Sequence, residues 1–211
     1  MTLAPFAPVA ATGFAIAFLH AALPTHWLPF VLVGRAHGWG TRKILGVTGL
    51  AGGGHVLFTL ILGMVLTGAG LAMQPHLGDL FPKAVAALLL GLGLFYLGRQ
   101  AFGGSHTHRD RTAKLGARSD TAAMVGLVAI LTFSPCEAFL PLYLANVDYG
   151  WGGFVALSLV LALGTCLAML LFTGLCLAGA DRFRLERLER YEAAVIGLVL
   201  CGLGLFVALE A

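Results

Sequence analysis

Two proline-bearing stretches hold most of the side chains in this sequence that could bind a cation. The first runs from His20 to Pro29 and the second from Ser134 to Pro141. Imidazole, thiolate and carboxylate groups together are ligands for divalent metals such as Zn²⁺, Ni²⁺ and Co²⁺, whereas Mg²⁺ and Ca²⁺ sites are built from oxygen. The residues predicted to bind such a metal are His20, His26, His55, Cys136 and Glu137.

Each of these stretches carries two prolines, which predict an interrupted helix. A proline inside a helix cannot donate to the carbonyl four residues earlier. If the helices were continuous, Pro24 would leave the carbonyl of His20 free and Pro141 that of Glu137. Glu137 is also the one acid expected deep in an apolar segment, where an unpaired charge is costly and indicates function. Free carbonyls beside these side chains would suit a cation.

The elements that must position these residues are predicted to be membrane-spanning helices. Of the 211 residues, 59% are hydrophobic and only 11% are charged, and no soluble domain of this size could bury so much apolar surface. The apolar runs are about 20 residues or longer, which is the length that crosses a bilayer. Six spans are predicted, at Val9–Val33, Ile44–Leu71, Phe81–Phe102, Ala122–Asn146, Gly152–Ala180 and Tyr191–Leu209.

The distribution of Lys and Arg predicts how these spans are oriented. Short loops rich in basic residues stay on the cytoplasmic side during insertion. Every basic residue except Lys83 falls in alternate connections, so both termini are expected outside, in a bacterial inner membrane. The basic residues of those connections are Arg35, Arg42, Lys43, Arg99, Arg109, Arg111, Lys114, Arg118, Arg182, Arg184, Arg187 and Arg190.

The chain resembles itself at an offset of 111 residues. The GLGLF sequence at 91–95 recurs at 202–206, and the other matches lie in all three pairs of predicted helices. Each half would hold an odd number of spans, so the halves must be inverted relative to one another, as in many secondary transporters. The matched pairs are Pro24 with Pro135, Gly53 with Gly164, Gly63 with Gly174, Gly68 with Gly179 and Phe95 with Phe206.

The repeat predicts three parts of the chain and a central site. Residues 1–103 and 122–211 form the two three-helix repeats, and residues 104–121 form a cytoplasmic loop with His106 and His108. The offset places His26 opposite Glu137, Thr25 opposite Cys136 and His55 opposite Cys166. In this kind of fold the substrate binds near the midplane, at the interface of the repeats.

The first two histidines have the spacing of a known transporter motif. His20-x4-Thr25-His26 resembles the His-x4-Asp-His signature of nickel/cobalt transporters, and Gly54-His55-Val56 resembles that family's Gly-His-Ser motif. The Ser134-Pro135-Cys136-Glu137 run and the repeat plan resemble the wider superfamily of lysine exporters and cytochrome-biogenesis thiol carriers. Thr25 stands where the family has an acid, and Glu137 is the candidate for the missing carboxylate. The resemblance implies transport of a divalent transition metal.

The expected function is therefore secondary transport of Zn²⁺, Ni²⁺ or Co²⁺, with the metal as substrate, no prosthetic group and no enzymatic activity. The expected partners are the lipid bilayer and the metal ion, with a homodimer as a further candidate, and no basic stripe with interleaved aromatics points to nucleic acid. Two alternatives stay open. One is a thiol–disulfide electron carrier, which would need a pair of cysteines. The other is an exporter of an amino acid or a small organic cation, with Glu137 as the counter-charge.

Overall fold

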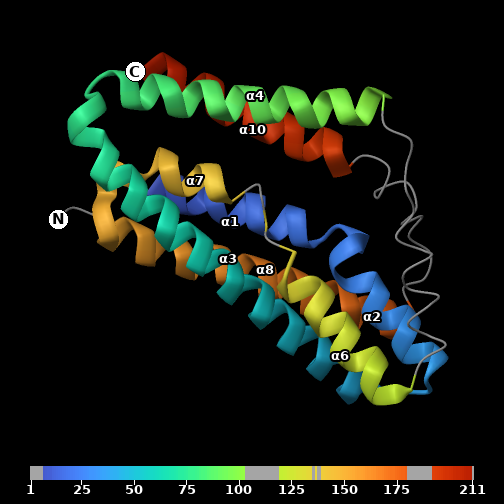
Figure 1. The fold of residues 1–211 in the computed structure, drawn as a ribbon. Coiled ribbons are helices and arrows are strands. Elements are labelled where there is room, and N and C mark those ends of the chain that lie inside the picture. The colour runs from blue at the N-terminus through green and yellow to red at the C-terminus, as the bar shows by residue number, and fades with distance from the viewer. Residues whose placement is uncertain (1–6, 103–118, 135, 137–138, 180–191, 211) are drawn as a thin grey trace.

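The computed structural model describes residues 7–102, 119–134, 136, 139–179 and 192–210, and over these residues it is helical, without a strand. The helices run lengthwise in one bundle, with α4 and α10 forming one side of it (Figure 1). In chain order the elements are α1 (Ala7–Ala21), α2 (Pro24–Ala36), α3 (Thr41–Leu77), α4 (Leu80–Phe102), α6 (Asp120–Thr132), α7 (Leu140–Ala145), the 3₁₀ turn η2 (Val147–Tyr149), α8 (Gly150–Leu177) and α10 (Glu192–Glu210).

Four helical segments among the described residues are long and apolar enough to cross a membrane. They are Val9–Ala36, which joins α1 to α2, then Thr41–Leu77, Leu80–Ala101 and Val147–Leu177. An all-helical chain with four such segments belongs to the class of α-helical membrane proteins. The two other predicted spans fall on shorter apolar helices, because α6 has only 13 residues and the apolar part of α10 is Leu200–Leu209.

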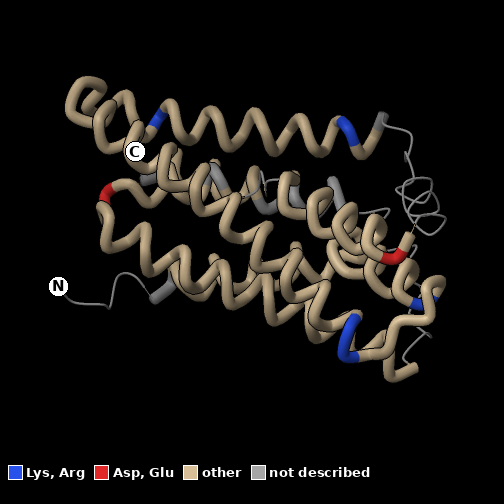
Figure 2. Tube along the Cα trace, turned by 60° about the horizontal axis from the view of Figure 1, so that its bottom comes forward, with Lys and Arg blue, Asp and Glu red and all other residues tan. Residues whose placement is uncertain are grey.

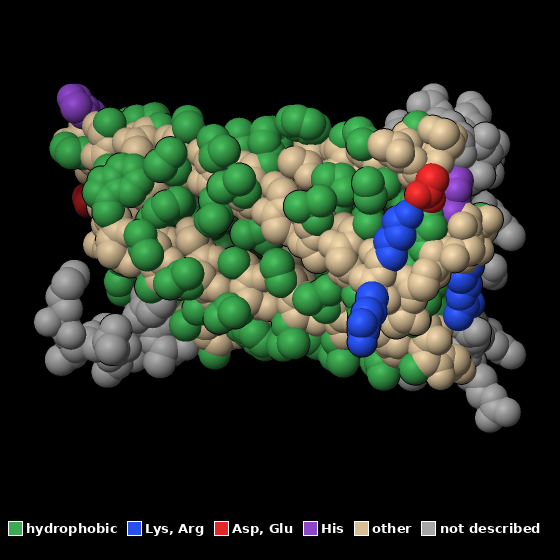
Figure 3. Space-filling view, turned by 90° about the horizontal axis from the view of Figure 1, so that it is seen from below, with side chains coloured by type: hydrophobic (Ala, Val, Ile, Leu, Met, Phe, Trp, Pro, Cys, Tyr) green, Lys and Arg blue, Asp and Glu red, His purple; other side chains and the backbone are tan. Residues whose placement is uncertain are grey.

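The surface of the bundle agrees with this class. Large apolar side chains on the long helices face outward, among them Leu57 on α3 and Leu163 on α8, which are 60% and 66% exposed. Charged residues lie near the two ends of the bundle and leave its length without charge (Figure 2). The space-filling view shows the same division, with apolar side chains over the middle and the basic residues gathered at one end (Figure 3). Lipid would solvate such a surface better than water.

The arrangement of the helices centres on α3 and α8, which pack against each other along the bundle. Helix α1 packs against α8, and α6 packs against α3. Helix α2 also contacts α8, and α7 contacts α3. At the offset of 111 residues α1 corresponds to α6, α2 to α7 and α3 to α8, so each of these contacts has a counterpart in which the two halves exchange places.

Helices α4 and α10 pack through small residues at matching positions. A Cβ at Gly93 would lie 2.7 Å from the main-chain nitrogen of Cys201, and a Cβ at Gly204 would lie 2.9 Å from that of Leu90. Both residues of the first pair become those of the second at the offset of 111. Such close approach of backbones is typical of helices that associate in membranes. The recurring GLGLF sequence therefore has a packing role in this pair.

The first predicted span is interrupted, but differently from a continuous helix with a proline in it. Helix α1 ends at Ala21 and α2 begins at Pro24, whose missing N–H costs nothing at a first helical position. The carbonyl of His20 is not free, because it accepts a hydrogen bond of 3.2 Å from the Leu23 N–H. The expectation of an unpaired His20 carbonyl was wrong, since the chain turns before the proline and satisfies that oxygen locally.

The fourth predicted span is also interrupted. Helix α6 ends at Thr132, and α7 begins at Leu140 as a helix of six residues. The Phe133 and Ser134 N–H groups close the end of α6 by donating to the carbonyls of Ala129 and Leu131. Both halves thus have a broken first helix, at corresponding positions in the repeat.

Candidate functional site

The break between α1 and α2 brings two of the predicted metal ligands together. His20 lies in the last turn of α1 and His26 in the first turn of α2. Their ring centroids are 4.5 Å apart in an edge-to-face arrangement. The turn between them is held by the Trp27 indole N–H, which donates to the carbonyl of Ala22 at 2.9 Å. A straight helix would place residues six apart on different faces, so the break is what pairs these imidazoles.

The third predicted histidine joins the pair from α3. The ring centroids of His26 and His55 are 5.7 Å apart, and both side chains are buried, at 7% and 2% exposure. The Nδ1 atom of His20 and the Nε2 atom of His55 are buried and have no hydrogen-bond partner among the described residues. Unpaired nitrogen atoms in an apolar interior are costly. The cluster therefore offers lone pairs or N–H groups that the fold itself does not use.

The orientation of the His55 ring is set by the broken end of α6. Its Nδ1 lies 3.1 Å from the carbonyl oxygen of Leu131. A carbonyl can only accept, so Nδ1 carries the proton, and in a neutral ring Nε2 then holds a lone pair. Histidines that bind metal commonly donate their other ring N–H to a carbonyl in this way. His55 is thus prepared as a ligand before any ligand arrives.

The fourth predicted ligand lies beside His55 through the hydroxyl of Thr59. That hydroxyl donates to the carbonyl of His55 at 2.9 Å and accepts from the Cys136 main-chain N–H at 3.3 Å. Cys136 is 2% exposed and packs with Phe139 and Tyr143. The Phe139 ring also meets His20 edge to face, at 5.8 Å. The segment after α6 is therefore anchored on α3 next to the histidines.

Several predicted residues are not brought into this cluster by the described part of the structure. Glu137, His106 and His108 lie outside the described residues. Cys166 is half-buried on α8 and does not line the cavity beside His55. Among the described residues, no three His, Cys, Asp or Glu side chains are placed to hold one metal ion together. The histidines form a stacked group, and a closed coordination shell would require further ligands or a rearrangement.

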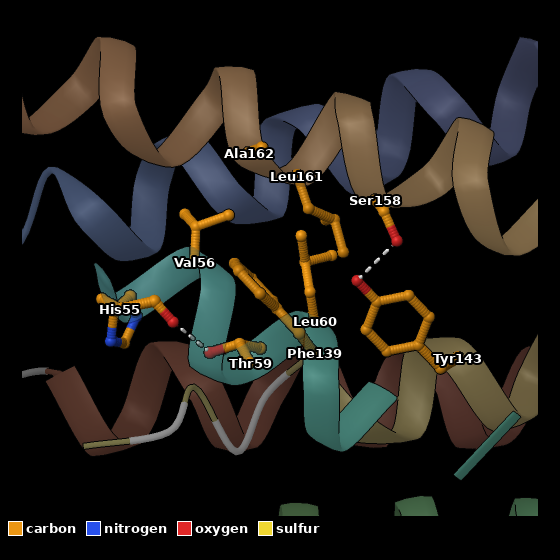
Figure 4. Close-up of a pocket in the computed structure, with 9 residues that line it drawn as sticks. All are labelled: His55, Val56, Thr59, Leu60, Phe139, Tyr143, Ser158, Leu161 and Ala162. Carbon is orange, nitrogen blue, oxygen red and sulfur yellow. Dashed lines mark hydrogen bonds between the residues drawn. The ribbon is translucent and has the colours of Figure 1, made fainter. Parts of the chain in front are cut away.

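A small cavity extends from His55 along α3 and contains residues that the sequence did not single out. Its volume of about 10 Å³ is at the lower limit for one water molecule. The Tyr143 and Ser158 hydroxyls lie at its far end and share a hydrogen bond of 3.1 Å (Figure 4). Thr59 and Ser158 could have been found as polar residues within apolar spans, but Tyr143 carries no signal of its own. The lining residues are His55, Val56, Thr59, Leu60, Phe139, Tyr143, Ser158, Leu161 and Ala162.

A polar cluster at the basic end of the bundle fixes the pairing of α3 with α6, on which the His55 contact depends. Asp120, at the start of α6, accepts hydrogen bonds from the Trp39 indole N–H and from the Lys43 ammonium, the latter at 2.5 Å. These donors hold the pKa of the exposed Asp120 carboxyl below its usual value, with Lys43 the main cause and Trp39 the second. His37 faces the same carboxylate at 3.7 Å.

Comparisons with known proteins leave the site to be read from its own geometry. No protein-family model matches the chain, and no significant match was found among curated proteins or solved structures.

Proposed function

We propose that this protein is a secondary transporter that moves a divalent transition metal, of the Zn²⁺, Ni²⁺ or Co²⁺ class, through the histidine cluster. The observation that carries the proposal is the His55 side chain. Its Nδ1–H is taken by the Leu131 carbonyl, and its buried Nε2 has no partner. Because a buried lone pair without a partner is unfavourable, the site gains most from a cation that accepts it.

The proposed architecture has six crossings in two inverted halves, with both termini outside. It is supported by the exchange of helix contacts at the offset of 111 residues and by the matching Gly93 and Gly204 contacts. In this arrangement α6 with α7 makes the fourth crossing, and α10 makes the sixth. The basic residues Arg35, Arg42 and Lys43 would then lie on the cytoplasmic side.

The proposed transport step is an exchange of water for protein ligands. The metal sheds water in the cluster and binds His26, His55, Cys136 and Glu137, with His20 as a further ligand, and Glu137 supplies a negative charge. The ion leaves on the other side as the two halves rock about the site. Protonation of Glu137 or of a histidine weakens binding and aids release, because ligands must be deprotonated to hold a metal.

The experiment that tests this function is metal flux into proteoliposomes across a panel of divalent ions. We expect flux of at least one of Zn²⁺, Ni²⁺ and Co²⁺, and we expect His55→Gln to reduce it at least about tenfold. His76→Gln is the matched control, because His76 is exposed at the end of α3, where its Nδ1 donates to the Ala72 carbonyl of its own helix. Equal flux by the wild type and His55→Gln would overturn the proposed site.

The same preparation separates the two alternative functions. A thiol–disulfide carrier would lose all electron transfer in Cys136→Ser, whereas a metal site with several other ligands keeps part of its flux. An exporter of amino acids or organic cations would show protection of Cys136 from alkylation by those substrates and not by metal ions. Glu137→Gln completes the set, because unimpaired metal flux in that variant would remove the proposed carboxylate ligand.

A further inference from the structure

The cavity beside His55 leads along α3 toward one end of the bundle. His55, Thr59 and Gly63 follow one another at intervals of one helical turn on the buried face of α3. Tyr143 packs over Gly63, where an added Cβ would come within 3 Å of three atoms of the tyrosine ring. Glycine at this position therefore lets the ring lie flat against α3. Two turns beyond the histidine, the face of the helix is closed by an aromatic side chain.

The closing contact is a hydrogen bond between two different helices. Tyr143 belongs to α7 and Ser158 to α8, and the two hydroxyl groups are 2% and 6% exposed by residue. Between this pair and His55 stand only Leu60, Leu161 and Phe139 (Figure 4). A buried hydroxyl needs a partner, and each of these two finds it in the other. If α7 moved away from α8, both hydroxyls would have to be satisfied by water or by a passing ion.

We propose that the space between His55 and the Tyr143–Ser158 pair is one half of the permeation path, and that this hydrogen bond is its closure. The inference rests on the proposed transport function and adds the residues that line and shut the path. The ligand it would take is a partly hydrated divalent cation, which exchanges water for hydroxyl oxygens as it passes Thr59, Tyr143 and Ser158. The pair opens when α7 separates from α8.

The position of α7 in the chain fits this role. It is a helix of six residues that follows the break after α6, and η2 connects it to α8. Its contacts are with α3, α4 and η2. Movement of such a short element breaks few helical hydrogen bonds, since the chain on both sides of it is already out of regular α-helix. The Tyr143–Ser158 bond is the described side-chain hydrogen bond from α7 that reaches across to α8.

The test measures access to Cys136, which packs in the same buried cluster as Tyr143. In a background of Cys166→Ser, Cys176→Ser and Cys201→Ser, the full chain in proteoliposomes is treated with a charged, membrane-impermeant methanethiosulfonate reagent. We expect Tyr143→Phe, and separately Ser158→Ala, to raise the initial rate of Cys136 modification about fivefold, the effect of losing one net hydrogen bond. Tyr96→Phe is the control, because Tyr96 is a buried tyrosine in the separate α4–α10 cluster.

The outcomes distinguish this inference from the proposed function. Modification at the wild-type rate in both Tyr143→Phe and Ser158→Ala, with full reactivity of Cys136 after denaturation, would overturn the closure. If the wild type moved metal in the flux assay at the same time, the transport function would stand without this closure. Faster modification in a protein that moves none of the metals would support the path and remove its cargo. Gly63→Ala is a further variant, which should raise the rate by displacing the tyrosine ring.

Discussion

His55 on α3 and Leu131 on α6 are joined by a hydrogen bond of 3.1 Å, from the imidazole Nδ1–H to the main-chain carbonyl oxygen. That oxygen lies in the last turn of α6, where helical carbonyls lose their usual donors. The break in the fourth predicted span therefore supplies the acceptor that orients the histidine. One bond ties a repeat to its counterpart and sets the unused nitrogen of the candidate site.

Thr59→Val should destabilise the protein by about 1–3 kcal/mol, because it leaves the buried Cys136 N–H without its acceptor. Thr48→Val is the matched control. Thr48 is also buried on α3, and its hydroxyl donates only to a carbonyl of its own helix, that of Ile44. The measurement is the free energy of unfolding in mixed micelles. Equal losses in the two variants would show that the Thr59–Cys136 contact contributes nothing.

Gly93→Ala and Gly204→Ala should each cost about 1–3 kcal/mol, because the new methyl group would overlap the backbone of the partner helix. Gly91→Ala and Gly202→Ala lie in the same repeated sequence, and a Cβ there meets no atom within 4 Å. These two should be neutral or more stable by up to about 1 kcal/mol, as expected for alanine in a helix. Thermal unfolding of all four in detergent would contradict the α4–α10 packing if the pairs behaved alike.

Acid should weaken the contact between α3 and α6 at the basic end. The folded-state pKa of Asp120 is lowered, mainly by Lys43 and next by Trp39, so its stabilising contribution is present above the ordinary Asp value of about 4. It is lost as the pH falls below that value and through the lowered pKa. The Tm of the wild type should therefore approach that of Asp120→Asn between about pH 4 and pH 2.

The control for this acid effect is a His37→Gln background, because His37 is the other titratable group that faces the carboxylate of Asp120 besides Lys43. The convergence of the two Tm curves should persist there. A constant difference between wild type and Asp120→Asn at every pH would contradict a role for the ionised carboxylate.

Thr25→Val should weaken metal binding about tenfold or more, because Thr25 Oγ1 and His26 Nδ1 share a hydrogen bond of 3.2 Å that holds the ring. Thr67→Val is the comparison, since the buried Thr67 hydroxyl has no hydrogen-bond partner among the described residues and lies farther along α3. Calorimetric titration of the purified protein with Zn²⁺ measures both. An unchanged affinity in Thr25→Val would mean that the ring is held by other contacts.

The sequence alone was sufficient for the features that depend on local composition. Long apolar runs predict membrane-spanning helices because each must match the thickness of a bilayer, and four of the predicted spans are such segments. Pro24 predicts a break because it lacks an N–H, and the chain does break beside it. His20 and His26 were selected because polar residues in apolar helices are costly, and they do lie together.

The tertiary structure decided what depends on contacts between distant segments. The sequence does not say which carbonyl His55 finds, since Leu131 lies 76 residues away and is an ordinary apolar residue. Nor does it indicate that Tyr143 meets Ser158, because a hydroxyl in an apolar span becomes informative only when its partner is known. Composition determines which segments leave water, but the pairing of helices within the bundle decides which buried polar groups satisfy one another and which nitrogen atoms stay available.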